Sequence, residues 1–376
     1  MEIYRPQLKD ILTDLEKKMV ILVGPRQVGK TWIAKEVIKK FSKTLYLNWD
    51  NPQDRLVIKQ GNFPETLELI VFDEIHKMRG WKNFVKGTYD TKPANTRILI
   101  TGSAKLNALK NVGDSMVGRY FSHHIFPLSF KELAGSAFEG DMERLLSRGG
   151  FPEPFLADKD EDAARWRNQY VGSSINAEVL DFAEAQDLKA MSDIVSLLRT
   201  KVGSPVSFRN IAADIGVSPI TVKRYAQILE DLHIIFILRT YTKKINRSIL
   251  KEPKIYFYDI GLVTDAGARL ENLIALSLLK HAQYLKDTKG ASLSLAYIRT
   301  KDGREADFAV TENDVLKEII EVKTSDASPS KHLKYFAERH KGAAATQLVK
   351  EMRHRELSVD NIRIARIKEY LEGLAI

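Results

Sequence analysis

No cysteine occurs in this chain. Disulfides are therefore excluded, and so is a metal site built from thiolates. The chain also lacks an apolar run of the roughly 20 residues that a membrane-spanning helix needs. Residues 1–6 do not show the basic and then apolar order of a secretory signal. We therefore expect a cytoplasmic protein that has no membrane partner.

By contrast, the chain is long and rich in charged residues. The chain has 376 residues, of which 44% are hydrophobic and 28% charged, so we expect two or three soluble domains. Its formal net charge of +9 favours a polyanion such as DNA as a partner.

The most specific motif is a loop that binds phosphate. Residues 20–23 are apolar and mostly β-branched, which predicts a buried strand, and residues 32–38 have the spacing of a helix. The residues that we predict to bind nucleotide lie between them and at the helix start: Gly24, Pro25, Arg26, Gln27, Val28, Gly29, Lys30, Thr31 and Trp32. All but the last fit the pattern G-x-x-x-x-G-K-[ST]. Its backbone N–H groups point at phosphates, its lysine supplies charge, and its threonine offers a hydroxyl to Mg²⁺. The sequence therefore predicts that ATP or ADP binds here with magnesium.

A second, acidic motif follows another apolar run, residues 69–72. It consists of Asp73 and Glu74. In a nucleotide-binding α/β domain, Asp73 would hold Mg²⁺ and Glu74 would polarise the attacking water. The alternative interpretation is an acidic helix start after a strand.

Two further positions are candidates for contact with the γ-phosphate. Thr101 or Ser103, at the end of a third expected strand, would sense it, although an N-cap for the next helix explains these hydroxyls nearly as well. Arg119 precedes the last strand of the sheet. Its guanidinium would stabilise the phosphate in its own subunit or in a neighbouring subunit of a homo-oligomer. A surface salt bridge is the alternative for Arg119.

Residues 205–225 predict a helix-turn-helix motif. One helix ends at Gly216, and Ser218 caps the next. Two strands are expected further on, at residues 232–238 and 255–258, and would complete a winged helix around a basic loop. The residues predicted to contact DNA lie at the start of the second helix and in that loop: Thr221, Lys223, Arg224, Lys243, Lys244 and Arg247. Packing inside the protein is the alternative role for this module.

The last third of the chain predicts a site for a divalent metal ion. Glu321 and Lys323 are two residues apart on an expected strand, so they face the same side, where Asp307 of the neighbouring strand can meet them. Asp307 and Glu321 would hold Mg²⁺, and Lys323 would orient water or offset the charge of the reacting phosphate. A solvated charged face is the alternative.

The chain also resembles two known groups of proteins. The likeness to AAA-superfamily ATPases of bacteria and archaea is carried by the phosphate loop and by residues 72–76, 100–103, 118–119 and 127–130. It is closest for the branch that has a C-terminal extension of unknown function. This resemblance implies a five-stranded parallel sheet in which the acidic strand lies next but one to the phosphate-loop strand. It also implies a nucleotide contact at Pro152, in a Gly-x-Pro element, where a plain turn is the alternative.

The second likeness is to the restriction-endonuclease-like superfamily. It is carried by Asp307, Glu321 and Lys323, with Glu271 on an earlier helix. The resemblance implies a nuclease-like fold, which either cleaves DNA or serves as a binding module.

Together these observations predict an α/β protein in four segments. They are an AAA-type ATPase core with a parallel sheet (1–135), a helical lid or linker (136–200), a winged helix-turn-helix (201–262) and a small α/β restriction-endonuclease-like domain (263–376). The predicted function is a Mg-dependent ATPase coupled to DNA binding and, through the last domain, to DNA cleavage. The alternative is an ATP/ADP switch that regulates protein assembly, with the last domain as a scaffold.

Overall fold

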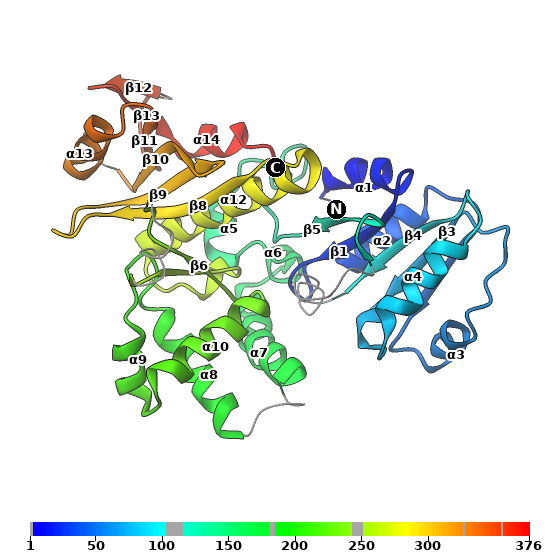
Figure 1. Cartoon of the computed structure of the whole chain (residues 1–376). Coiled ribbons are helices and arrows are strands. Elements are labelled where there is room, and N and C mark those ends of the chain that lie inside the picture. Colours follow the sequence, from blue (N-terminus) through cyan, green and yellow to red (C-terminus); the bar gives the residue numbers. More distant parts are fainter. Residues whose placement is uncertain (1–2, 103–115, 180–184, 243–250, 326–327, 355) are drawn as a thin grey trace. The chain divides into compact units, whose positions relative to one another are not determined.

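The computed structural model describes residues 3–102, 116–179, 185–242, 251–325, 328–354 and 356–376 (Figure 1). The chain divides into two compact units, one of residues 3–126 and the other of residues 127–376. The finer division into four segments stays a prediction. Among the described residues, no helix is long and apolar enough to cross a membrane.

A five-stranded parallel sheet forms the centre of the first unit. Its strands are β1 (Met19–Val23), β2 (Thr44–Asn48), β3 (Leu69–Asp73), β4 (Arg97–Thr101) and β5 (Tyr120–His124). They lie in the order β2-β3-β4-β1-β5, and every neighbouring pair is parallel. Every residue of β1 and β3 is buried, as their uninterrupted apolar sequences predict. The expected position of the acidic strand, next but one to β1, is confirmed.

Helices cover this sheet. They are α1 (Gln7–Leu15), α2 (Lys30–Ile38), α3 (Pro52–Gln60) and α4 (Trp81–Thr91), with a short 3₁₀ helix η1 (Ile75–Lys77) after β3. Ile58 of α3 and Val85 of α4 pack with Ile21 and Phe72 of the sheet in one apolar cluster. Because all five strands are parallel, their carboxyl ends lie at the same edge, where the phosphate loop and the acidic motif both begin.

The second unit begins with helices. They are η4 (Lys131–Leu133), α5 (Met142–Arg148), α6 (Pro152–Leu156), α7 (Asp160–Val179), α8 (Ala185–Leu198), α9 (Phe208–Ile215) and α10 (Pro219–Asp231). The last two are joined by a short turn at the position where the sequence predicts a helix-turn-helix: α9 ends at Gly216, which has φ of 73°, and the Ser218 hydroxyl accepts the Thr221 N–H at 3.0 Å. An antiparallel pair follows, β6 (Ile235–Leu238) and β7 (Lys254–Phe257).

A six-stranded mixed sheet completes this unit. After η5 (Ile260–Leu262), its elements are α12 (Ala266–Lys289), β8 (Leu293–Arg299), β9 (Glu305–Glu312), β10 (Val315–Lys323), α13 (Lys331–Arg339), β11 (Ala344–Val349), β12 (Glu356–Val359), β13 (Ile362–Arg366) and α14 (Ile367–Gly373). The strand order is β12-β13-β11-β10-β9-β8. The hairpin β8–β9 and the pairing of β9 with β10, both expected from the sequence, are confirmed.

The β6–β7 pair is joined to this sheet by backbone hydrogen bonds. Tyr241 N donates to Tyr297 O at 2.6 Å, and Tyr297 N donates to Arg239 O at 3.1 Å. Helix α12 packs against both β7 and β8. As a result, side chains of β7 lie beside residues of α12 and β9, an arrangement that the sequence does not reveal.

Candidate functional site

Two glycines allow the phosphate loop to follow its path. Gly24 has φ of 143°, and a Cβ at this position would lie 2.1 Å from the carbonyl oxygen of Ile125. Gly29 has φ of 100° and directly precedes α2. Residues with a side chain avoid this backbone region, so both positions require glycine.

The loop is held by two buried cations. The Lys30 ammonium donates to Gly24 O at 2.9 Å and to Pro25 O at 2.5 Å, and the residue is 7% exposed. The Arg5 guanidinium donates to Val28 O at 2.7 Å and to Phe126 O at 3.0 Å. Arg5, which the sequence analysis missed, therefore fastens the loop to the segment that follows β5. The predicted loop residues differ in solvent exposure: Pro25 is buried, whereas Gln27 is exposed.

Asp73 is the centre of a polar cluster at the carboxyl edge of the sheet. It is 2% exposed and accepts hydrogen bonds from the hydroxyls of Thr31, at 3.2 Å, and of Thr101 and Tyr46. Burial, and then the hydrogen bond to Asp73, raise the pKa of Tyr46. The residues fit a magnesium ion, because the Thr31 hydroxyl and the Asp73 carboxylate already lie side by side next to the phosphate loop.

Glu74 directly follows this cluster and has a left-handed backbone, with φ of 57°. Its Oε2 lies 3.2 Å from Lys77 Nζ and 3.7 Å from His76 Nε2. Lys77 also pairs with Asp50 at 2.6 Å. A carboxylate held in this way beside the Asp73 cluster is placed to accept a proton from water.

The position of Arg119 corrects one prediction. Met19 N donates to Arg119 O, so Arg119 lies where β1 begins, whereas the phosphate loop follows Val23 where β1 ends. At about 3.3 Å per residue, roughly 13 Å of strand separates these edges, more than an arginine side chain spans. Arg119 instead pairs with Asp90, with nitrogen–oxygen distances of 2.8 and 3.1 Å. The proposed contact with a phosphate in the same subunit is therefore wrong, and a contact in a neighbouring subunit stays a prediction.

Some predicted residues lie outside the described part of the chain: Ser103, Lys243, Lys244 and Arg247. Those on α10 are described. Thr221 takes part in the Ser218 cap, and Lys223 is exposed. The Arg224 guanidinium lies 3.7 Å from the Asp187 carboxylate of α8, which competes with any phosphate for this charge.

Pro152 is the first residue of α6, and packing explains the glycines before it. Leu128 N donates to Gly150 O at 2.6 Å, and a Cβ on Gly150 would lie 2.4 Å from Leu128 O. A Cβ on Gly149 would lie 2.2 Å from the Asp259 carboxylate. The nucleotide contact of Pro152 stays a prediction.

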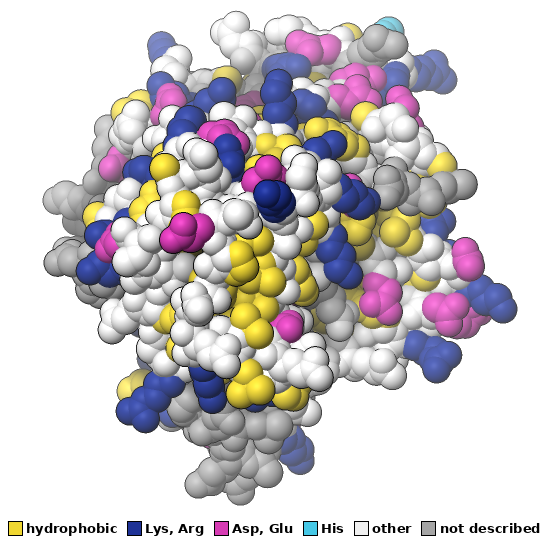
Figure 2. Space-filling model, turned by 90° about the vertical axis from the view of Figure 1, so that its right-hand side faces the viewer, with side chains coloured by type: hydrophobic (Ala, Val, Ile, Leu, Met, Phe, Trp, Pro, Cys, Tyr) yellow, Lys and Arg dark blue, Asp and Glu magenta, His cyan; other side chains and the backbone are white. Residues whose placement is uncertain are grey.

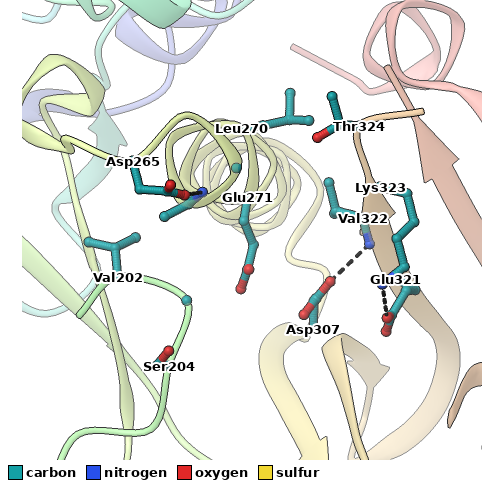
Figure 3. Close-up of a pocket in the computed structure, with 13 residues that line it drawn as sticks. Val202, Ser204, Asp265, Leu270, Glu271, Asp307, Glu321, Val322, Lys323 and Thr324 are labelled. Atoms are coloured by element: carbon teal, nitrogen blue, oxygen red, sulfur yellow. Dashed lines mark hydrogen bonds and ion pairs between the residues drawn. The ribbon is translucent and has the colours of Figure 1, made fainter. Parts of the chain in front are cut away.

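A second polar site lies in the unit of residues 127–376. A pocket of about 350 Å³ is lined by four residues named from the sequence, Glu271, Asp307, Glu321 and Lys323. Figure 3 shows them around one space, contributed by α12, β9 and β10. Ile320 pairs with Phe308, which sets Glu321 opposite Asp307 in the sheet. The predicted convergence of these side chains is thus confirmed.

The carboxylates of Asp307 and Glu321 differ in their hydrogen-bond partners. One Asp307 oxygen accepts the Val322 N–H at 2.9 Å. Glu321 is 6% exposed; its Oε1 lies 2.8 Å from Lys323 Nζ, whereas its Oε2 is buried without a hydrogen-bond partner. Burial, and then Asp307, raise the pKa of Glu321. A buried carboxylate oxygen without a partner is costly, and a cation in the pocket would relieve that cost.

The sequence analysis missed two charged residues beside this pocket, Lys254 and Glu305. Lys254 of β7 is fully buried, and its Nζ lies 2.8 Å from Glu305, 3.2 Å from Glu271 and 3.4 Å from Asp307. Burial would lower the pKa of Lys254, but the three carboxylates raise it. Burial and the nearby Asp307 raise the pKa of Glu271 to about 7, although Lys254 opposes this. In the described part of the chain, no group of three or more His, Asp or Glu side chains is arranged to hold a metal ion by itself.

On the face that Figure 2 shows, surface charge alone does not mark a binding site. In the view of Figure 2, Lys and Arg side chains are interspersed with Asp and Glu side chains. On this face, the net charge of +9 is therefore not gathered into a single patch.

Comparisons with known families divide the chain into three parts. Residues 16–134 match an AAA domain, and residues 139–272 and 266–370 match two domains of unknown function, DUF8612 and DUF4143. Residues 16–134 are therefore similar to an AAA domain, which agrees with the parallel sheet and the phosphate loop of the first unit.

Individual relatives are distant. An uncharacterized protein of Mycobacterium tuberculosis is 27% identical over 247 residues, which are 65% of this chain and 55% of that protein. The chain thus spans about half the length of this relative. An uncharacterized protein of Methanocaldococcus jannaschii is 24% identical over 357 residues, 84% of this chain and 77% of that protein. Among solved structures, the Walker-type ATPase of Pyrococcus abyssi is similar with a TM-score of 0.44 and 14% identity, over 71% of this chain and 96% of that one.

Proposed function

We propose that this protein is a Mg-dependent ATPase coupled to DNA binding, and that its C-terminal pocket cleaves phosphodiester bonds with a divalent cation. The observation that carries the ATPase proposal is the meeting of Lys30, Thr31 and Asp73 at one edge of the parallel sheet.

The chain's own residues suit phosphoryl transfer to water. The Lys30 ammonium would leave the loop carbonyls and bind phosphate oxygens, where its charge is needed most. Thr31 and Asp73 would hold Mg²⁺, which supplies charge neutralisation on the phosphates when bound. Glu74 would orient a water molecule and take its proton, while Tyr46 and Thr101 keep the Asp73 carboxylate in place.

Glu74→Gln is expected to bind ATP normally and to turn over at least about a hundredfold more slowly, because an amide cannot accept the proton from water. Binding of a fluorescent ATP analogue and release of phosphate measure the two effects separately. Glu68→Gln, in the same unit but outside the site, serves as the control. Full turnover by Glu74→Gln would contradict the assignment of the general base.

DNA binding is supported by the helix-turn-helix geometry of α9 and α10 and by the net charge of +9. Lys223 is exposed near the start of α10, where such a motif contacts DNA. Arg224 shares its charge with Asp187, so its contribution is expected to be smaller than that of Lys223.

Lys223→Ala is expected to weaken DNA binding and to lower the salt dependence, the slope of log K against log salt, by about 0.9 for the lost phosphate contact. Fluorescence anisotropy with labelled duplex DNA at several salt concentrations measures both. Lys17→Ala removes an exposed lysine of the other unit and should leave the slope unchanged. Equal slopes for Lys223→Ala and the wild type would leave α10 as a packing element.

Cleavage is supported by the convergence of Asp307, Glu321 and Lys323 on one pocket. Asp307 and Glu321 would hold the cation, and the unpartnered Glu321 Oε2 is the atom best placed to gain from it. The cation would supply Lewis acidity at the phosphate. Lys323 would donate to a phosphate oxygen and stabilise the charge that develops during cleavage.

A nucleotide switch with a scaffold domain is the second candidate, and the neutralising contacts of Lys254 favour it. The two candidates differ in one measurement, the rate of ATP hydrolysis with and without DNA. A rate that rises with DNA supports the coupled ATPase. A rate indifferent to DNA, together with assembly that depends on the nucleotide, supports the switch.

A further inference from the structure

The most unusual charged group outside the predicted set is Lys254. It is fully buried, and its ammonium contacts the carboxylates of Glu271, Glu305 and Asp307 at 3.2, 2.8 and 3.4 Å. These carboxylates come from α12 and β9, whereas the lysine comes from β7. Without it, three carboxylates would face one another in a poorly hydrated place, which is strongly unfavourable.

The lysine cannot readily leave this position. Its backbone pairs with Leu238 of β6 and forms a bridge with Pro205 on the other side. Glu271 is held as well, because the Tyr256 hydroxyl donates to its Oε1 at 2.6 Å. Arg299 lies 3.4 Å from Glu305 and adds further positive charge. The ammonium is therefore a fixed part of the site, unlike Lys323, whose side chain is 37% exposed.

A separate observation marks where a mobile cation would bind. Glu321 Oε2 is buried in the pocket wall without a hydrogen-bond partner, and none of the ion pairs of Lys254 involves Glu321. The Asp307 carboxylate lies between the two positions, since it contacts Lys254 on one side and faces the pocket on the other.

We propose that the Lys254 ammonium permanently fills a cation position beside the pocket, between Glu271, Glu305 and Asp307, so that the pocket itself takes a single divalent cation, at Glu321 and Asp307. The inference rests on the proposed function in one respect only, that the pocket binds a divalent cation. Lys254 is then a positioning residue that keeps Glu271, Glu305 and Asp307 together without metal.

The test is the number of Mn²⁺ ions bound by the full chain, measured by electron paramagnetic resonance without nucleotide. An Asp73→Asn background removes the carboxylate of the ATPase site. We expect one Mn²⁺ in this background and two after Lys254→Met, which keeps the length and volume of the stem but frees three carboxylates. Lys323→Met removes, by the same substitution, a lysine that lines the pocket and is expected to leave the number at one.

Folding is followed in the same samples by thermal unfolding. If Lys254→Met folds only with Mn²⁺ added, this dependence supports the proposal, because metal then replaces the ammonium. If Lys254→Met fails to fold even with Mn²⁺, the test moves to Lys254→Arg, which retains the positive charge. The proposal then requires that Lys254→Arg folds and binds one Mn²⁺, and any other result overturns it.

The number of bound ions tests the role of Lys254 and the proposed metal site separately. Two ions in the parent protein, or no increase after Lys254→Met, would overturn the role of Lys254 while leaving a metal-binding pocket. No ion in the parent but one after Lys254→Met would refute the proposed metal site and support the role of Lys254.

Discussion

Lys30→Ala is expected to abolish tight ATP binding. The ammonium is buried against the carbonyls of Gly24 and Pro25, so it lies inside the loop that would surround the phosphates. Truncating one partner of a buried charged pair costs about 2 to 5 kcal/mol, which corresponds to about 30-fold to 5,000-fold in Kd. Isothermal titration with ATP and Mg²⁺ measures the loss.

The control for this variant is Lys35→Ala. Lys35 lies on the same helix, α2, but is exposed, so its loss should change ATP affinity little. Circular dichroism of both variants checks that the sheet is intact. If Lys30→Ala retained the affinity of the wild type while Lys35→Ala lost it, the loop would not bind phosphate in the proposed way.

The phosphate loop was predictable because its chemistry is local in sequence. A buried strand, two glycines and a helix start occur within residues 19–38, and each imposes its own conformation. The same holds for the turn between α9 and α10, whose capping residues Gly216 and Ser218 are visible in the sequence. The convergence of Asp307 and Glu321 was also predictable, because it required only that two consecutive strands pair with each other in antiparallel orientation.

What could not be predicted depends on contacts between distant segments. Tyr46 reaches Asp73 because β2 happens to be the neighbour of β3, and a tyrosine on a strand gives no signal of this. In the sequence, Lys254 follows a basic stretch, so it is easily interpreted as part of the wing of a winged helix. Its burial among carboxylates beside the pocket results from the packing of α12 against β7.

The misplacement of Arg119 has a different cause. The prediction that Arg119 directly precedes a strand was correct. However, the direction of that strand, β5, decides at which edge of the sheet Arg119 lies. In a parallel sheet, residues before a strand lie at the edge opposite to the nucleotide. Strand order and direction together would have excluded the contact within one subunit.

Asp307→Asn and Glu321→Gln are expected to abolish cleavage of DNA in Mn²⁺ while leaving ATP hydrolysis largely intact. Each substitution preserves shape but removes the negative charge that holds a divalent cation. Asparagine can still accept the Val322 N–H through its carbonyl oxygen, so the sheet should remain in register. The two sites lie in different units of the chain, and their activities can therefore be lost separately.

Lys323→Met should behave differently from the two carboxylate variants. We expect it to bind Mn²⁺ and to cleave about a hundredfold more slowly or worse, because the lost charge acts mainly on the transition state. Glu312→Gln is the matched control: it lies on the same strand as Asp307 but forms an exposed ion pair with Lys317 at 3.3 Å. Nicking of supercoiled plasmid, measured beside phosphate release from ATP, reports both activities. If the wild type cuts no form of DNA in Mn²⁺, or if Asp307→Asn cuts as well as Glu312→Gln, the pocket is not a nuclease site and its carboxylates serve the binding or scaffold role.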